Sequence, residues 1–268
     1  MTTPEVFAPA KINLTLHVTG QRADGYHLLD SLVMFADVGD TLRLTPASQL
    51  SMSVTGPLSD GVPSDHRNLV WQAAIHARWT GHIDLEKHLP HGAGIGGGSS
   101  DAAALLRAAN FAGDASALGA DVPVCLHGRA ARMSGIGEVI RPVDGLPQLH
   151  AVLVNPGVHV PTPRVFAALT HKDNPAMSTL PTAQTAGAFV QWLRDQRNDL
   201  EAPAVSAQPV IADVLKALTK VACGGVVRMS GSGATCFALF QNKGQAELAA
   251  KDLAGVHPDW WVRACALS

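Results

Sequence analysis

The stretch Pro90-His-Gly-Ala-Gly-Ile-Gly-Gly-Gly-Ser-Ser-Asp-Ala-Ala-Ala104 is the most informative part of this chain. Five of the seven residues from Gly92 to Gly98 are glycine, and an Ala- and Leu-rich segment, Asp101 to Phe111, follows at once. Because glycine lacks a Cβ atom, the backbone can curl tightly and bring several N–H groups to one anion. We expect a helix after the glycines, capped by Ser99 or Ser100. A glycine-rich loop that leads into a helix N-terminus predicts a phosphate site.

Two better-known phosphate loops fit this stretch less well. The P-loop requires a Gly-Lys-Ser/Thr sequence after its glycines, and this stretch contains no lysine. A loose G-x-G-x-x-G can be written from Gly92, Gly94 and Gly97. A dinucleotide site also needs a hydrophobic strand before the glycines and an acidic residue about 20 residues further on. Neither residues 82–89 nor residues 113–116 fit that pattern, and a flexible surface loop is the plain alternative.

The glycines resemble the phosphate loop of the GHMP kinases, the superfamily of the galactokinase, homoserine, mevalonate and phosphomevalonate kinases. The triple glycine followed by Ser-Ser-Asp-Ala-Ala is most similar to the branch that phosphorylates 4-diphosphocytidyl-2-C-methyl-D-erythritol. This resemblance implies an α+β, two-domain GHMP kinase fold with the active site in the interdomain cleft, and ATP with Mg²⁺ as cofactors. It implies these ATP-binding residues: Asn68, Lys87, Pro90, His91, Gly92, Ala93, Gly94, Ile95, Gly96, Gly97, Gly98, Ser99 and Ser100.

A lysine and an aspartate complete the expected catalytic site. Lys11 and Asn13 lie two residues apart in an alternating segment, so both side chains leave the same face of a strand. A lysine in such a place is usually only solvated, but Pro9-Ala-Lys-Ile-Asn-Leu14 is similar to the first signature of this branch. Asp121, in Gly119-Ala-Asp-Val-Pro123, would otherwise be a turn-initiating residue. The resemblance implies Asp121 as the base for the substrate hydroxyl and Lys11 as its electrostatic partner.

Substrate specificity is expected at the turn Asp24-Gly-Tyr-His27. Tyr26 is the single tyrosine of the chain, and its ring can stack on a pyrimidine while His27 bonds to the base edge. The resemblance implies Phe166 on the opposite face of the base, although a helical phenylalanine is otherwise an ordinary core residue. Arg228-Met-Ser-Gly-Ser-Gly-Ala-Thr-Cys236 looks like a third signature, whose glycines let the backbone approach the phosphate loop; a tight turn between strands is the alternative. The implied substrate-binding residues are Asn13, Tyr26, His27, Phe166, Gly231, Ser232 and Gly233.

The composition indicates a globular enzyme. The 268 residues are 47% hydrophobic, carry a formal net charge of −2 and include no apolar run near the roughly 20 residues that span a bilayer. Four scattered cysteines suggest reduced thiols in the cytoplasm, and twelve histidines show no metal-binding spacing. The composition therefore predicts neither nucleic acid nor membrane as partner, and the oligomeric state is left open. The resemblance implies a small cytidyl alcohol as substrate. Ser99 or Ser100 could contact Mg²⁺, for which the sequence offers no clear carboxylate pair.

Hydrophobic periodicity predicts alternating strands and helices in both halves of the chain. Three prolines, at positions 156, 161 and 163, suggest two domains, 1–155 and 156–268. Two departures from the family pattern are a shortened segment at residues 110–119 and a histidine at position 91, where a small or apolar residue is usual. The expected strands are 10–18, 31–38, 41–45, 50–54, 131–140, 152–155, 236–240 and 260–266, and the expected helices are 68–79, 162–169, 186–194, 210–218 and 245–253.

Overall fold

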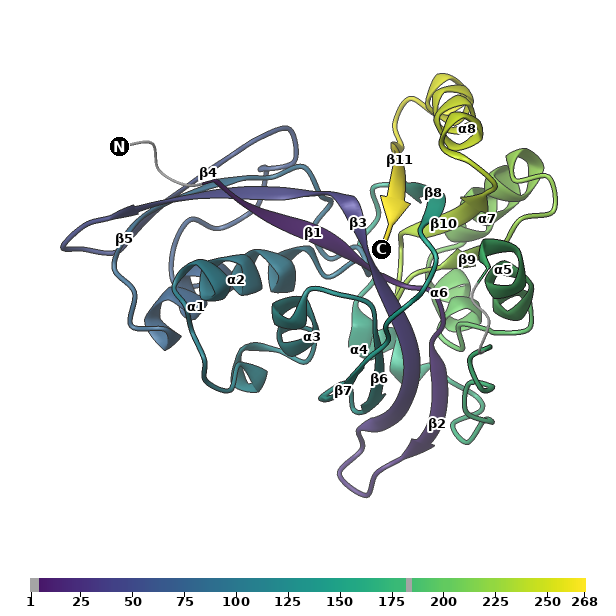
Figure 1. Cartoon of the computed structure of the whole chain (residues 1–268), viewed down its shortest axis with the longest axis horizontal. Coiled ribbons are helices and arrows are strands. Elements are labelled where there is room, and N and C mark those ends of the chain that lie inside the picture. Colours follow the sequence, from purple (N-terminus) through teal and green to yellow (C-terminus); the bar gives the residue numbers. More distant parts are fainter. Residues whose placement is uncertain (1–4, 182–184) are drawn as a thin grey trace. The chain divides into compact units, whose positions relative to one another are not determined.

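Residues 5–181 and 185–268 are described by the computed structural model of this chain, whose elements are labelled in Figure 1. Their contacts divide the chain into two units, and each unit draws on separate stretches of sequence. Unit 1 consists of the chain up to Lys11, Val38–His91 and Gly96–Gly128. Unit 2 consists of Ile12–Asp37, Gly92–Ile95 and Arg129–Ser268.

The sheet of unit 1 is built around strand β5 (Gly81–Glu86). This strand pairs antiparallel with the second half of β3 (His27–Pro46), where Leu44 lies opposite Ile83, and parallel with β4 (Ser51–Thr55). Strand β1 (Glu5–Asn13) also pairs with β3. Ile83 and Leu85 are buried, whereas the alternating residues His82, Asp84 and Glu86 are partly exposed. One face of β5 therefore contributes to the core.

The helices of unit 1 include α1 (Leu69–His76), α2 (Gly97–Ala108) and α3 (Val122–His127). Helices α1 and α2 lie side by side in Figure 1 and make extensive contacts. Their buried faces are rich in alanine, which lets two helix backbones approach closely: Ala73 and Ala74 on α1, and Ala102, Ala103 and Ala104 on α2. A short 3-10 helix, Ser116–Leu118, precedes α3.

The main sheet of unit 2 is antiparallel, in the order β11 (Trp261–Leu267), β8 (Leu149–Asn155), β10 (Cys236–Phe240) and β9 (Val227–Met229). A second group of strands follows the chain through β2 (His17–Gln21) and the first half of β3. There β3 pairs with β6 (Ala131–Gly135), which pairs in turn with β7 (Val139–Pro142).

The helices of unit 2 cover its main sheet with apolar side chains at helical spacing. The core includes Ile211, Val214 and Leu218 of α7 together with Val152 and Val154 of β8. Helix α8 lies beside β11 in Figure 1. The helices of this unit include α4 (Thr162–Ala167), α5 (Ala186–Arg194), α6 (Glu201–Ala207), α7 (Val210–Val221) and α8 (Lys243–Val256).

The structure confirms most expected elements and corrects several. Helix α5 and strand β10 have the expected bounds, whereas the strands expected at 31–38 and 41–45 are one continuous strand, β3. The expected strand at 10–18 is divided between β1 and β2, and β5 and α6 were not expected at all. The expected serine cap of α2 is wrong, because the helix begins at Gly97 and Gly96 occupies the cap position. The division into domains at residue 155 stays a prediction; the contact-based units have other bounds.

Candidate active site

Lys11 and Asp121, the residues that the sequence suggests for catalysis, form an ion pair within unit 1. Lys11 Nζ lies 2.9 Å from Asp121 Oδ2. The side chain of Lys11 on β1 is 4% exposed, whereas that of Asp121, directly before α3, is 36% exposed. A buried cation therefore holds a carboxylate that is still open to a small molecule.

The end of the glycine-rich loop lies against the stem of Lys11. A Cβ atom at Gly96 would stand 3.2 Å from Lys11 Cε and 3.7 Å from Cys125 Sγ. Burial, and then the charge of Asp121, raise the pKa of Cys125 to about 12. The thiol therefore stays protonated and acts as a small apolar neighbour of the ion pair.

The glycine-rich loop, Pro90 to Gly96, uses glycine where the backbone requires it. Gly92, Gly94 and Gly96 have φ values of +63°, +74° and +65°, a left-handed conformation that other residues rarely adopt. Helix α2 then begins at Gly97 without a side-chain cap. The first N–H groups of a helix have no intrahelical acceptor, so they are available to an anion. A Cβ atom at Gly98 would meet no atom within 4 Å.

Ser100, in the first turn of α2, carries a hydroxyl that no described residue satisfies. Its side chain is completely buried, and its Oγ has no hydrogen-bond partner in the described part of the chain. Buried polar atoms are nearly always paired. This hydroxyl, directly after the glycine-rich loop, therefore fits a site that receives a ligand.

A buried lysine between two aspartates lies beside this turn. Lys87 Nζ donates to Asp40 Oδ2 and, at 2.8 Å, to Asp101 Oδ2, and all three side chains are at most 3% exposed. Burial lowers the pKa of Lys87, but the two carboxylates outweigh burial and raise it. Burial raises the pKa of Asp101, and the attraction of Lys87 opposes that rise.

In unit 2, the third glycine-containing motif packs directly on the loop. Ser230 Oγ donates to the Gly94 carbonyl at 3.0 Å, and the Thr235 N–H donates to the Ala93 carbonyl at 3.1 Å. A Cβ atom at Gly94 would stand 2.5 Å from the Ser230 carbonyl oxygen, and one at Gly231 would stand 2.7 Å from the Gly94 carbonyl oxygen. The predicted approach of the motif to the loop is therefore present.

The residues expected to bind a base lie together near the start of β3. The rings of His27 and Phe166 stack with centroids 5.0 Å apart, while Tyr26 is 61% exposed. His27 Nε2 is buried and has no hydrogen-bond partner in the described ranges. Burial, and then the charge of Lys172, lower the pKa of His27, which keeps its ring neutral at pH 7. A neutral imidazole with an unpaired nitrogen can recognise the polar edge of a ligand.

Asn13 and Ser232, the other side chains expected to bind substrate, are held by hydrogen bonds. The Asn13 N–H donates to Ser230 Oγ at 3.0 Å, and its Nδ2 donates to Ser31 Oγ at 2.8 Å. Ser232 Oγ lies 2.7 Å from Thr162 Oγ1. All of these contacts lie within unit 2.

Known proteins match this chain over nearly its full length. Family models for the GHMP kinases N terminal domain and the GHMP kinases C terminal match residues 68–129 and 181–258. The 4-diphosphocytidyl-2-C-methyl-D-erythritol kinase of Dinoroseobacter shibae is 59% identical, over 96% of this chain and 92% of the relative. The chain belongs to the 4-diphosphocytidyl-2-C-methyl-D-erythritol kinase family. The Cereibacter sphaeroides kinase of the same name is 53% identical, over 96% of this chain and 97% of the relative.

A solved structure of a kinase from this family has the same fold. The crystal structure of 4-(cytidine 5'-diphospho)-2C-methyl-D-erythritol kinase superposes with a TM-score of 0.80 at 34% identity, covering 99% of both chains. The expected α+β GHMP kinase fold with N- and C-terminal domains is thereby confirmed. As a GHMP kinase, the chain is an enzyme that uses ATP and a small-molecule substrate.

The side chain of Asn68 makes hydrogen bonds at the N-terminus of α1. Its Oδ1 accepts the Val70 N–H at 2.9 Å, and its Nδ2 donates to the Pro63 carbonyl at 2.7 Å. Asn68 thereby caps the N-terminus of α1. Its place beside the nucleotide stays a prediction, as does the role of His91, an exposed residue of the loop.

Sequence reasoning missed Asp40, Asp101 and the role of Arg228. Asp101 begins the helical segment expected from the sequence, and acidic residues are common in a first turn because they favour the helix dipole, so it gave no sign of its buried partner. Arg228 donates to the carbonyls of Leu14, Leu193 and Gln196. Burial lowers its pKa to about 10, so it stays charged at neutral pH while it ties these segments together. A charged residue within an apolar segment is the sequence feature that could have indicated a buried ion of this kind.

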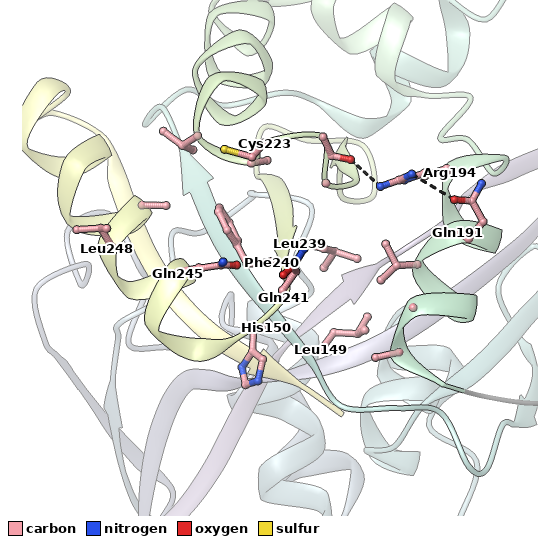
Figure 2. Close-up of a pocket in the computed structure, with 18 of the residues that line it drawn as sticks. Leu149, His150, Gln191, Arg194, Cys223, Leu239, Phe240, Gln241, Gln245 and Leu248 are labelled. Carbon is pink, nitrogen blue, oxygen red and sulfur yellow. Dashed lines mark hydrogen bonds between the residues drawn. The ribbon is translucent and has the colours of Figure 1, made fainter.

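A cavity of about 620 Å³ in unit 2 is separate from these groups (Figure 2). It is lined by Leu149 of β8, Phe240 of β10 and residues of α5, α7 and α8, and by none of the residues expected to bind ATP or substrate. Arg194 crosses one side of it and donates to the Gly224 carbonyl and to Gln191, as Figure 2 shows. Each unit thus carries candidate functional groups, the Asp121 carboxylate and Ser100 Oγ in unit 1 and His27 Nε2 in unit 2, and this cavity contains none of them.

The described residues contain neither a metal-binding cluster nor a membrane-spanning helix. Over residues 5–181 and 185–268, no group of three or more His, Cys, Asp and Glu side chains could hold a metal ion. None of the helices in those ranges has the length and apolar character needed to cross a bilayer.

Proposed function

We propose that this kinase transfers the γ-phosphoryl group of ATP to the 2-hydroxyl of 4-diphosphocytidyl-2-C-methyl-D-erythritol, in the non-mevalonate route to isoprenoid precursors. The observation that carries the proposal is the Lys11–Asp121 ion pair, with its carboxylate 36% exposed. The names of relatives at 53% and 59% identity support the choice of alcohol.

Asp121 and Lys11 are assigned complementary roles in this transfer. Asp121 accepts the proton of the attacking hydroxyl and orients its oxygen toward the phosphorus atom. Lys11 supports the charge of that carboxylate and compensates the negative charge of the transferring group. Phosphoryl transfer requires little covalent chemistry from the protein, so a positioned hydroxyl and nearby positive charge supply most of the catalysis.

The nucleotide phosphates are assigned to the loop from Pro90 to Gly96 and the first turn of α2, through Ser100. The support is the set of N–H groups at an uncapped helix start and the open space beside Gly98. Asn68 and Lys87 are assigned to the surroundings of the nucleotide because they match family positions.

Ser100, or its neighbour Ser99, is assigned to Mg²⁺. The unpaired buried Oγ of Ser100 fits an oxygen ligand of such an ion. When bound, Mg²⁺ would supply positive charge that offsets the negative charge of the nucleotide phosphates. The protein's own part is to hold one hydroxyl at the start of α2.

The cytosine base is assigned to Tyr26, His27 and Phe166. The unpaired Nε2 of the neutral His27 ring supports a hydrogen bond to the base edge. Tyr26 is exposed enough to place its ring on a base face. Asn13 and the segment Gly231–Gly233 are assigned to the remainder of the substrate.

A panel of alcohols tests this proposal. Release of ADP is measured with 4-diphosphocytidyl-2-C-methyl-D-erythritol, mevalonate, homoserine and galactose, each at several concentrations. We expect turnover with the cytidyl alcohol and at most a trace with the others. Faster turnover of another alcohol would overturn the substrate assignment and leave the kinase family intact.

A further inference from the structure

We propose that Lys87 is a positioning residue, which fixes the two ends of the glycine-rich loop to one buried point. The inference rests on the proposed function, in which this loop receives the nucleotide phosphates. All of the groups that carry it, Asp40, Lys87, Leu89 and Asp101, lie in unit 1.

The chain that enters the loop is held by Asp40 on β3. Asp40 Oδ1 accepts the N–H groups of His88 and Leu89 at 2.6 and 2.8 Å. Its other oxygen, Oδ2, accepts from Lys87 Nζ. The Asp40 side chain is completely buried, so water does not compete for these bonds. One carboxylate therefore fixes the backbone directly before Pro90.

The chain that leaves the loop is held by Asp101 on α2. Asp101 Oδ2 accepts from the same Lys87 ammonium at 2.8 Å. A Cβ atom at Gly97 would stand 3.7 Å from Asp40 Oδ2, so the first residue of α2 also packs on this cluster. Lys87 thereby joins the segments on both sides of the loop.

Direct contact between Lys87 and a phosphate is the competing role, and the geometry opposes it. The Lys87 side chain is 3% exposed, and its ammonium already binds two buried carboxylates. Two acidic partners compensate its positive charge, so it presents little attraction to an anion outside the cluster.

A loop rich in glycine needs such fixed ends. Glycine loses more backbone entropy than other residues when it is ordered, so each fixed contact around Gly92, Gly94 and Gly96 lowers the entropic cost of binding. Anchored ends reduce that loss before the nucleotide arrives, which raises affinity without a new contact.

The test compares Asp101→Asn, Lys87→Met, the double variant and the control Arg43→Met. Arg43 also makes an ion pair in unit 1, with Glu5 at 3.1 Å, but that pair is exposed. Two quantities are measured on the full chain: the Kd of ADP by calorimetry, and amide hydrogen exchange of residues 86–101 without nucleotide.

We expect Asp101→Asn to raise the Kd of ADP about tenfold, and Lys87→Met at least as much. Both variants should exchange residues 86–101 faster than wild type, and the double variant should resemble Lys87→Met because each change breaks the same link. Arg43→Met should match wild type. If Lys87→Met does not fold, the Kd of ADP and the amide exchange of Asp101→Asn test the proposal by themselves.

Weaker ADP binding with unchanged exchange in Lys87→Met would overturn the proposal and assign Lys87 a direct contact. Wild-type affinity and exchange in both single variants would overturn it as well. Failure of the wild-type chain to bind ADP would instead count against the proposed function, while the exchange measurement would still report on the anchoring of the loop.

Discussion

The Asp121 carboxylate combines a buried cationic partner with an open face, and its charge is the property that we assign to catalysis. Asp121→Asn keeps the shape of the side chain and removes its ability to accept a proton. We expect kcat to fall by about 10²–10⁴, the usual effect of losing a general base, while the Kd of ADP stays within a factor of three. Asp60→Asn, an exposed change in unit 1, is the control. More than a tenth of wild-type kcat in Asp121→Asn would exclude the base role.

Tyr26 offers a test of base recognition that does not disturb the fold, because its side chain is 61% exposed. Loss of stacking on a base costs roughly 1–3 kcal/mol. Tyr26→Ala should therefore raise the KM for the cytidyl substrate about 5- to 150-fold and leave the KM for ATP unchanged. Tyr26→Phe should be mild because the ring face is kept. A change confined to the KM for ATP would assign Tyr26 to the adenosine site instead.

His27 provides a prediction about pH. Burial and then the charge of Lys172 lower its pKa, so the folded protein releases the His27 proton more readily than the unfolded chain does. The unfolding free energy should therefore decrease as the pH falls through 6.5 and below, and His27→Gln should reduce that decrease. Lys172→Met removes one cause and should move the His27 pKa upward, toward 6.5, as followed by NMR titration. A downward movement would contradict the assigned cause.

Single residues were predictable from sequence only where a motif contained them. Lys11 and Asp121 are far apart in the chain, and the resemblance of both segments to one family was needed to pair them. Asp40 lies outside any such signature, and Asp101, although it belongs to the glycine-rich stretch, was given no role. Their role depends on burial against Lys87, and burial is a property of the folded chain that local sequence does not report.

At the scale of elements, the start of α2 is the place to which we assign the nucleotide phosphates. Gly98 and Gly187 are both the second residue of a helix, α2 and α5, and neither would bring a Cβ within 4 Å of another atom. Valine at either position should therefore be tolerated by the fold. Only Gly98→Val should weaken ADP binding, because its side chain enters the space assigned to phosphate. Equal ADP affinity in the two variants, measured by calorimetry, would place the phosphates elsewhere.

Helices and strands with a regular pattern of apolar residues were predicted well. Those in which polar residues or glycine interrupt that pattern were not. Helix α5 and strand β10 have uniform helical or apolar character, and their predicted bounds are correct. Strand β5 has the alternation of a strand, with Ile83 and Leu85 buried. It was not predicted because the polar residues next to them, His82, Asp84 and Glu86, make the segment less apolar. Strand β3 was predicted as two pieces because Gly39 and Asp40 interrupt its apolar residues, although pairing continues through Thr41 to Pro46.

At the scale of the whole molecule, nucleotide binding should stabilise the folded chain. A ligand that binds only the folded state adds about 2.7 kcal/mol when its concentration is 100 times its Kd. ADP at that ratio should raise the unfolding free energy of wild type and Asp121→Asn alike. At the same ADP concentration, Gly98→Val should gain much less. Chemical denaturation with and without ADP measures this difference, and loss of the gain in Asp121→Asn would show that this residue also binds nucleotide.

The grouping of distant stretches of the chain into units was the feature that local sequence patterns predicted least well. A change in proline content suggested one division near residue 155, but the contacts group residues 129–268 with 12–37 and 92–95. Contacts between distant stretches arise from strand pairing, such as that of β3 with β6, which no local pattern specifies. The family resemblance supplied the overall fold, because related chains retain such pairings as a set.

The mutual packing of Gly94 and Gly231 has a consequence for how this sequence can diverge. A side chain is excluded at both positions, because a Cβ at Gly94 would meet the backbone of Ser230 and Gly233, and a Cβ at Gly231 would meet the backbone of Gly94. The hydrogen bond from Ser230 to Gly94 joins positions 136 residues apart. Mutational libraries that vary one of the two segments alone should yield few working clones, and recombination between distant homologues should succeed only when both segments come from the same parent.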